Sequence, residues 1–255
     1  MPLTLTPIPG IPLIKNGDNL PNIIWNALLN NQIMLIDNDI LVITQKIISK
    51  AEGRLVNLSE VQVSQKAIEI SKTSNKDPRL IELILQESKE ILRVTTNHLI
   101  VEHSLGFVCA NAGIDHSNVN AENRNSEDCY LLLPKNPDLS AQKIKKDLEK
   151  KSGTKIGILI IDSHGRAWRN GIIGTAIGVA GTPALIDLRG KKDLFGFKLR
   201  ITQVAAADEL ASAASLIMGQ ADEKLPVVHV RGFPYPLRES SVKELIRPKE
   251  QDLFR

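Results

Sequence analysis

Hydrophobic residues occur along the chain in two arrangements, as short apolar runs and as longer stretches with one apolar side. Short apolar runs are typical of buried strands, and a repeat of three to four residues is typical of helices packed on a core. We predict strands at residues 40–48, 99–102, 130–133, 156–161, 198–204 and 225–230, and helices at residues 21–30, 64–71, 77–92, 140–153 and 206–218.

Capping residues mark several helix ends. Asp77 followed by Pro78 is a helix start, because the aspartate can accept from free backbone N–H groups and proline fits the first turn. We expect that helix to run to about Leu92. Ser140 is expected to cap a helix that Gly153 ends. The segment from residue 239 to 255 is charged, and we expect it to be loosely held.

The composition favours a folded protein that binds neither nucleic acid nor a membrane. The net charge is only +3 with both signs interspersed, and aromatic residues are 4% of the chain, too few for nucleic-acid stacking surfaces. No apolar run approaches the roughly 20 residues that span a bilayer. Cys109 and Cys129 are too few for a disulfide framework and lack a zinc-like spacing, so we expect a reduced, cytoplasmic protein.

Two apolar segments each lead to an aspartate that is followed by polar residues. One segment ends on Asp115, and the other ends on Asp162, with the Ser163 hydroxyl next to it. A strand that presents a carboxylate at its end is a rigid place for a metal ligand. We predict that Asp115 and Asp162 bind a divalent cation near a phosphate. The alternative, that each aspartate only caps a turn, stays open.

Basic residues near these segments are candidate phosphate contacts. Lys46 and Lys50 follow the predicted strand at residues 40–48, where a lysine can bind a phosphate or simply face solvent. Arg166 and Arg169 flank Trp168 and suit bidentate recognition of phosphate or carboxylate, or surface ion pairs. The glycine-rich residues 171–178 match neither a phosphate loop nor a dinucleotide-binding fingerprint. The residues alone therefore indicate a metal- and phosphate-binding enzyme of unspecified reaction.

Several colinear motifs resemble one known family. The chain resembles the coenzyme F-420:L-glutamate ligases, also called F-420 gamma-glutamyl ligases, over nearly its whole length. The motifs that carry the resemblance are Gly10-Ile11-Pro12, residues 44–54, Lys76-Asp77-Pro78-Arg79, and residues 106–118, 162–168, 176–181, 207–211 and 227–232.

The resemblance implies a GTP-dependent ligase. Such an enzyme joins the amino group of L-glutamate to the lactyl-phospho side chain of a deazaflavin coenzyme F-420 precursor, and then adds gamma-linked glutamates. The terminal phosphoryl group of GTP would convert the acceptor carboxylate into an acyl phosphate, which the glutamate amine attacks. The resemblance also implies two divalent cations (magnesium or manganese), a monovalent cation such as potassium, and a mixed α/β, two-lobed chain (residues 1–255 as one module) in an intertwined homodimer.

The resemblance also implies roles for particular residues. Asp115 and Asp162 would hold one metal, Ser163 and Gln220 a second, and Lys46 would act with the two aspartates in catalysis. The implied nucleotide-binding residues are Gly10, Ile11, Pro12, Leu13, Gln45, Lys46, Lys50 and Asn118, together with a closing loop of Met218, Gly219, Gln220, Ala221, Asp222, Glu223, Lys224 and Leu225.

Two departures from the family pattern leave other functions open. Many relatives have threonine and phenylalanine where Ser163 and His164 stand, although Ser163 keeps the ligating oxygen. Some bacterial relatives have polar residues where Ile172 and its neighbours lie. The alternatives are therefore a glutamate ligase acting on another acceptor such as a folate, or a nucleotide-binding module without catalysis.

Overall fold

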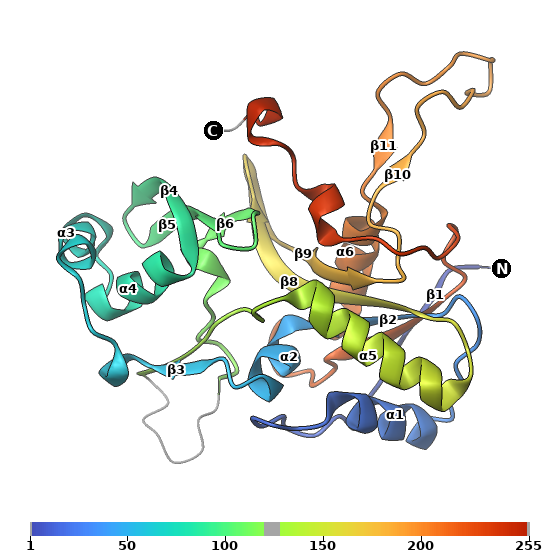
Figure 1. Ribbon diagram of the computed structural model, residues 1–255, viewed down its shortest axis with the longest axis horizontal. Helices are drawn as coiled ribbons and strands as arrows, with labels where there is room; N and C mark the ends of the chain where they lie inside the picture. Colours follow the sequence, from blue (N-terminus) through green and yellow to red (C-terminus); the bar gives the residue numbers. More distant parts are fainter. Residues whose placement is uncertain (1, 120–127, 254–255) are drawn as a thin grey trace.

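The centre of the molecule is a five-stranded sheet with the order β1-β12-β2-β8-β9 (Figure 1). The computed structural model describes residues 2–119 and 128–253. β2 and β8 are parallel, and the other neighbouring pairs are antiparallel. The five strands are β1 (Thr4–Pro7), β12 (Val227–Arg231), β2 (Ile40–Thr44), β8 (Gly157–Arg166) and β9 (Arg169–Ala180).

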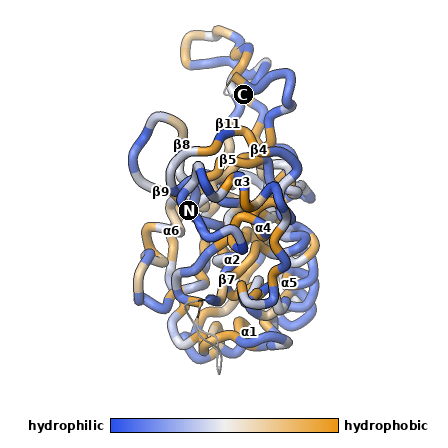
Figure 2. Tube along the Cα trace, turned by 90° about the vertical axis from the view of Figure 1, so that its left-hand side faces the viewer, coloured by the Kyte–Doolittle hydropathy of each residue, from blue (hydrophilic) through white to orange (hydrophobic). Residues whose placement is uncertain are grey.

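Helices cover both faces of this sheet, which gives three layers. α1 (Leu20–Asn30) and α5 (Pro137–Ser152) pack on one face, and α6 (Ala206–Met218) packs on the other. Alternate residues of β2 and β8 enter the two cores, as strand geometry requires. Figure 2 shows hydrophobic and hydrophilic positions alternating along α5, whose apolar side is buried. Among the described residues, none of the helices combines the length and hydrophobicity that crossing a bilayer requires.

A smaller sheet with its own core lies beside the central one (Figure 1). Its antiparallel strands are β4 (Ser88–Thr95), β5 (His98–His103) and β6 (Val108–Ala110), and it packs with α3 (Gln65–Ser74) and α4 (Pro78–Gln86). A separate pair, β3 (Leu55–Asn57) with β7 (Cys129–Leu131), leads to this region. The mixed α/β architecture is therefore confirmed.

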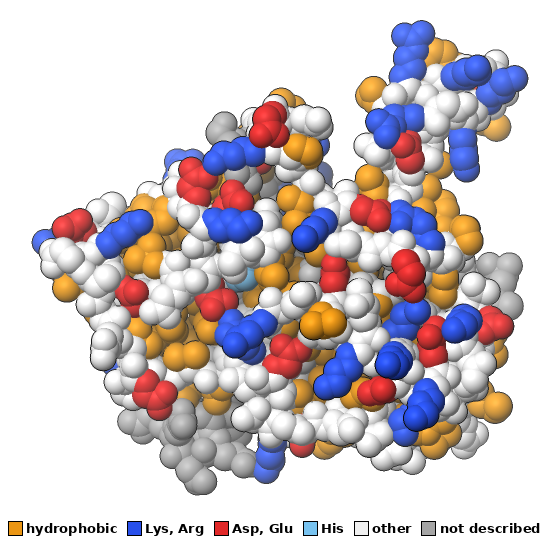
Figure 3. Space-filling model, in the orientation of Figure 1, with side chains coloured by type: hydrophobic (Ala, Val, Ile, Leu, Met, Phe, Trp, Pro, Cys, Tyr) orange, Lys and Arg blue, Asp and Glu red, His pale blue; other side chains and the backbone are white. Residues whose placement is uncertain are grey.

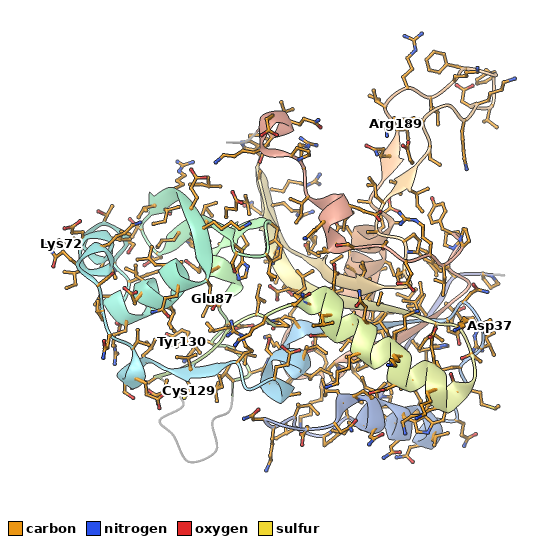
Figure 4. The ribbon with its side chains drawn as sticks, viewed as in Figure 1. Asp37, Lys72, Glu87, Cys129, Tyr130 and Arg189 are labelled. Atoms are coloured by element: carbon orange, nitrogen blue, oxygen red, sulfur yellow. The ribbon has the colours of Figure 1, made fainter. Side chains whose placement is uncertain are left out.

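An ion pair ties the end of α4 to the segment before β3. Arg54 donates from Nη2 to the Glu87 carboxylate over 2.8 Å, and its Nε donates to the Leu133 carbonyl over 2.8 Å. Figure 4 labels Glu87 at the inner end of α4. The guanidinium thus links chain segments that meet between the two sheets.

Several predicted boundaries were wrong in ways that matter for the site. The predicted strand at residues 40–48 ends at Thr44, and α2 (Gln45–Ala51) begins at once. The predicted helix at residues 77–92 ends at Gln86, because the next residues pair with β5 as β4. α5 begins at Pro137 rather than at Ser140, since the Asn136 side chain accepts from the Leu139 N–H over 3.1 Å and caps the helix.

Residues predicted as a strand at 198–204 form mostly a projecting arm. β11 (Gln203–Val204) pairs with β10 (Ile186–Asp187), Lys198 forms an isolated bridge with Lys192, and residues 188–202 extend from this base. Figure 1 shows the arm standing away from the body, and Figure 3 shows lysine and arginine side chains gathered on it. Arg189, labelled at its base in Figure 4, pairs with Asp187.

The apolar run that ends at Ile161 continues as β8 through Asp162 to Arg166, and the glycine-rich stretch is its partner β9. Asp162 therefore lies within a hairpin rather than at a strand end. Two glycines make this hairpin fit between helices: a Cβ at Gly174 would collide with the Ala211 carbonyl on α6, and one at Gly178 with Pro137 on α5.

The first part of the charged C-terminal segment, which was expected to be loosely held over residues 239–255, is held by hydrogen bonds. Ser241 Oγ donates to Asp138 over 2.6 Å, and Ser240 Oγ donates to the Thr182 carbonyl over 2.6 Å. Val242 is buried. These bonds fasten the segment to the start of α5 and the end of β9. Residues 254 and 255 lie outside the described part of the chain.

Candidate active site

A cleft of about 1950 Å³ lies where the central sheet meets the smaller sheet. Its walls come from the start of α2, the segment after β6, the outer half of the β8–β9 hairpin and the loop between α6 and β12. Asp115 and Asp162 both line it, although they are far apart in the sequence. The expectation that both carboxylates face one pocket agrees with this geometry.

Asp115 and Lys46 form an ion pair on one wall of the cleft. Lys46 Nζ lies 2.8 Å from Asp115 Oδ2 and also donates to Ser117 Oγ over 2.8 Å. Ser117 donates from its N–H and its hydroxyl to the other carboxylate oxygen, each over 2.8 Å. Burial pushes the Asp115 pKa upward, but Lys46 and Ser117 outweigh it and hold the pKa below its usual value. Asp115 is therefore a carboxylate at neutral pH.

Lys50 lies one helical turn after Lys46 on α2, so both side chains project from one face. Lys50 Nζ donates to the Asn118 carbonyl over 2.7 Å. Asn118 Nδ2 in turn donates to the Ala221 carbonyl over 3.0 Å, which links this wall to the loop after α6. Burial and the neighbouring Lys46 charge lower the pKa of Lys50. A bound polyanion would reduce the electrostatic repulsion between the ammonium groups of Lys46 and Lys50.

Asp162 is oriented by a histidine on its own strand. His164 Nε2 lies 3.0 Å from Asp162 Oδ2, and both side chains are 11% exposed. The His164 ring contacts Phe107 at 5.4 Å between centroids, and Phe107 stacks on His103 at 5.3 Å. This row of rings joins the β8–β9 hairpin to the end of β5. The Asp162 side chain is thereby fixed between the two sheets.

Ser163 and Gln220 meet across the cleft although 57 positions separate them. Ser163 Oγ donates to Gln220 Oε1 over 2.9 Å, and Gln220 Nε2 donates to Ser215 Oγ over 3.0 Å. Their oxygens lie next to each other, as a shared cation would require. Ser163 and Gln220 are therefore close enough to hold one cation, as the resemblance implies.

The oxygen-rich donor set fits a hard cation better than zinc. No group of three or more His, Cys, Asp or Glu side chains suited to a metal occurs within residues 2–119 and 128–253. Magnesium is usually held by one or two carboxylates together with substrate phosphate oxygens and water. Asp115, Asp162, Ser163 and Gln220 provide carboxylate, hydroxyl and amide oxygens on that pattern.

Most of the predicted site residues line this one cleft, and two do not. Gln45 is fully buried and accepts from Ser49 Oγ over 2.8 Å, while Gly10 lies outside the lining. The Gln45 side chain is therefore in the interior and does not line the cleft. The predicted residues that line the cleft are Ile11, Pro12, Leu13, Lys46, Lys50, Asp115, Asn118, Asp162, Ser163 and residues 218–225.

Three residues that support the site were not predicted to take part in it. Ser117 bonds to both members of the Lys46–Asp115 pair, and His164 contacts Asp162. Asp208 on α6 accepts from the Ala176 N–H over 2.9 Å and so holds β9 beside Asp162; burial raises its pKa. Asp208 lies in a motif that carried the family resemblance, but only the fold shows what it bonds to.

The fold and the cleft define the class: a mixed α/β protein with an open site lined by acidic, basic and oxygen-donating side chains. The model of the F420-0:gamma-glutamyl ligase family matches residues 10–232. The chain therefore belongs to the F420-0:gamma-glutamyl ligase family, and the resemblance indicated by its motifs is confirmed.

Curated relatives agree over the full length. The "Coenzyme F420:L-glutamate ligase" of Methanothermobacter thermautotrophicus is 45% identical over 257 residues, covering 100% of both chains. The protein of the same name from Methanocaldococcus jannaschii is 46% identical over 247 residues, covering 96% of this chain and 94% of its own. That of Archaeoglobus fulgidus is 38% identical over 255 residues, covering 100% and 97%.

Proposed function

We propose that this chain joins L-glutamate to a coenzyme F-420 precursor in a GTP-dependent reaction and then adds gamma-linked glutamates. The observation that carries the proposal is the cleft itself. In a member of this ligase family, Lys46, Lys50, Asp115 and Asp162 line one cavity together with Ser163 and Gln220. The names of the full-length relatives support glutamate as the donor and the deazaflavin coenzyme as the acceptor.

The basic wall of the cleft suits a nucleotide triphosphate. Lys46 and Lys50 project from one face of α2, and the loop of residues 218–225 lies opposite and is linked to them through Asn118. Burial and the Lys46 charge lower the Lys50 pKa, and a triphosphate placed here would favour the charged form of Lys50 instead. The apolar residues Ile11, Pro12 and Leu13 line the same cavity and would cover the base.

The chemistry follows from the weakness of a carboxylate as an acyl donor. An oxygen of the acceptor carboxylate attacks the terminal phosphorus of GTP, and the bond from that phosphorus to GDP breaks. The glutamate amine then attacks the acyl carbon, a proton leaves the nitrogen, and phosphate departs. Lys46 would stabilise negative charge on the transferring phosphoryl oxygens, and Asp115 keeps that ammonium in place.

Divalent cations complete the proposal. Asp115 with Asp162, and Ser163 with Gln220, would hold magnesium or manganese, which neutralises phosphoryl charge and aligns the displacement when bound. His164 and Ser215 orient two of these side chains before any ligand arrives. The monovalent cation stays a prediction, and we assign it no site among the described residues.

We also propose that the chain works as a homodimer, and that its two-lobed form belongs to that assembly. The projecting arm supports this, because it presents apolar side chains to solvent: Leu194 is 97% exposed, Phe195 95% and Ile201 87%. Exposed apolar clusters of this kind usually mark interaction sites. Light scattering of the native chain against Phe195→Asp tests it: a dimer that becomes a monomer supports the proposal, and a monomeric native protein contradicts it.

Product analysis tests the proposed reaction. The purified chain is incubated with the deazaflavin precursor, glutamate, magnesium and either GTP or ATP, and the products are weighed by mass spectrometry. We expect products heavier by one or more glutamyl residues with GTP. Extension of a folate with none of the deazaflavin would indicate the other acceptor. Nucleotide binding without any ligated product would indicate a non-catalytic module.

A further inference from the structure

The turn of the β8–β9 hairpin exposes a large aromatic residue inside the cleft. Arg166 and Arg169 form the last pair of the hairpin, and Ala167 and Trp168 make the turn between them. Trp168 is 84% exposed and lines the cleft. Figure 1 shows this hairpin, in yellow, extending beyond the helices that cover the central sheet. The indole is therefore a large exposed aromatic surface on the wall of the cleft.

The backbone makes tryptophan an unfavourable choice for this turn. Trp168 has φ = 57°, in the left-handed region that favours glycine and asparagine. A bulky side chain there is strained, and burial in the core does not offset the strain because the ring is exposed. Strain of this kind persists mainly where function requires the side chain.

The turn lies along the cleft from the two aspartates. Arg166 is four residues beyond Asp162 on β8, and a strand rises about 3.3 Å per residue, so the two lie roughly 13 Å apart along the strand. Arg166 lines the cleft, whereas Arg169 across the hairpin does not. Ile172 on β9 also lines it and is 54% exposed. A cation, an indole and an apolar side chain therefore come together at the outer end.

We propose that Trp168 and Arg166 form the acceptor subsite, with the flat deazaflavin ring stacked on the indole and the phosphodiester bound by the guanidinium. The inference rests on the proposed function and adds where the acceptor lies. The phospho-lactyl chain would then run along β8 toward Asp162, where its carboxylate reacts. The ring and the phosphodiester would therefore bind at the outer end of the cleft, and the nucleotide would bind at the opposite end.

Binding of the precursor tests the stacking contact. The chain has two tryptophans, and Trp25 packs against the core, so quenching of exposed indole fluorescence reports on Trp168. We expect Trp168→Ala to raise the Kd and the KM for the precursor about tenfold or more, with the KM for GTP unchanged. Trp168→Phe should recover much of the affinity. Leu216→Ala, equally exposed on α6 but outside the cleft lining, is the matched control.

A second pair of variants separates strain from function. Trp168→Gly should raise the melting temperature, because glycine adopts this φ without strain, and should still weaken precursor binding. Gln32→Gly, at φ = 55° after α1, should also raise the melting temperature and leave precursor binding unchanged. Stabilisation by both glycines with loss of binding in only one would support the subsite. Unchanged precursor binding in Trp168→Gly would overturn it.

The arginine is tested with two acceptor fragments. Arg166→Gln should raise the Kd for the precursor about tenfold and leave the Kd for a deazaflavin that lacks the phospho-lactyl group unchanged. Arg169→Gln is the matched control and should change neither. An equal effect of both arginine variants would contradict a specific phosphodiester contact.

The outcomes distinguish this subsite from the proposed function. If the native chain adds glutamate to the precursor and Trp168→Ala and Arg166→Gln keep native KM values, the subsite alone is wrong. If the native chain neither binds the precursor nor extends it, the proposed function fails and the subsite fails with it.

Discussion

Two carboxylates, Asp39 and Asp115, have similar cationic partners but different surroundings. Asp39 is 1% exposed and bonds to Arg231 through Nε (2.9 Å) and Nη2 (2.7 Å), with His229 Nε2 at 2.8 Å. Burial pushes its pKa upward, but these partners and the Ile36 N–H overcome it and lower the pKa to about 2. Asp115 has one lysine and one serine and is a quarter exposed.

The comparison separates a structural carboxylate from one that serves a site. Asp39 at the start of β2 is enclosed by residues from β12 and from the turn before it, so its interactions hold the sheet together. Asp115 faces a cleft and can exchange protein contacts for ligand contacts. Removing Asp39 should therefore reduce stability, and removing Asp115 should reduce activity. Four predictions test this division, from the largest expected effect to the smallest.

Asp162→Asn and Asp115→Asn should each lower kcat about 100- to 1000-fold, because developing phosphoryl charge would lose its electrostatic partners. Since both groups line an open cleft, the free energy of unfolding should change by less than about 1 kcal/mol. Steady-state kinetics and urea unfolding measure the two effects. Asp147→Asn on α5 is the control. A native kcat in either variant would show that the substituted aspartate has no role in catalysis.

Asp39→Asn should lower the free energy of unfolding by about 1.5–3 kcal/mol, because the buried carboxylate would lose its charge-assisted bonds to Arg231 and to the Ile36 N–H. The remaining folded protein should turn over normally. The pKa of Asp39 is below its usual value of 3.8, so its contribution to stability is complete above that value and is lost as the pH falls toward 2. The difference between native and variant should shrink below pH 4 in acid unfolding experiments.

Nucleotide affinity should fall at alkaline pH because Lys50 loses its proton more readily than an ordinary lysine. A bound triphosphate favours the charged form, so binding takes up a proton above the lowered pKa. Calorimetric titrations between about pH 7 and pH 10 measure this effect. Lys50→Met should bind GTP about tenfold more weakly with a flatter pH profile. An identical profile in Lys143→Met and Lys50→Met would contradict the assignment.

Asp138 extends the comparison to a third carboxylate, which holds the C-terminal segment. It accepts from the Val179 N–H over 2.8 Å and from Ser241 Oγ over 2.6 Å. Ser241→Ala removes this hydrogen bond and the one that the hydroxyl accepts from the Lys243 N–H over 3.2 Å, and it should lower the free energy of unfolding by about 1–2 kcal/mol, with no change in kcat. Thermal unfolding of this variant beside the native chain checks it. A loss of activity instead would connect the segment to catalysis.

The sequence predicted the strands and helices whose hydrophobic pattern is unambiguous, and it failed where tertiary pairing decides. The strands at residues 99–102, 130–133 and 225–230 and the helices at 64–71 and 206–218 correspond to β5, β7, β12, α3 and α6. The helix predicted after Pro78 runs too far, because Ser88 and the residues after it pair with β5. The local pattern of hydrophobic residues does not show whether another strand is placed to pair with the segment.

The site shows the same limit. Asp115 and Asp162 could be singled out because each follows an apolar run, and the family resemblance added Gln220. The roles of His164 and Asp208 could not be predicted, since they depend on how the hairpin packs between α6 and the smaller sheet. Gln45 could not be placed either, because its burial follows from α2 starting immediately after β2.

The most direct test of the account follows oxygen from the acceptor carboxylate. The precursor is labelled with oxygen-18 in its lactyl carboxylate and incubated with glutamate, magnesium and GTP. Mass spectrometry then examines the released phosphate. The account predicts one labelled oxygen in the phosphate released with the first amide, unlabelled phosphate with each later gamma-linked glutamate, and loss of the transfer in Asp162→Asn. Amide formation accompanied only by unlabelled phosphate would contradict it.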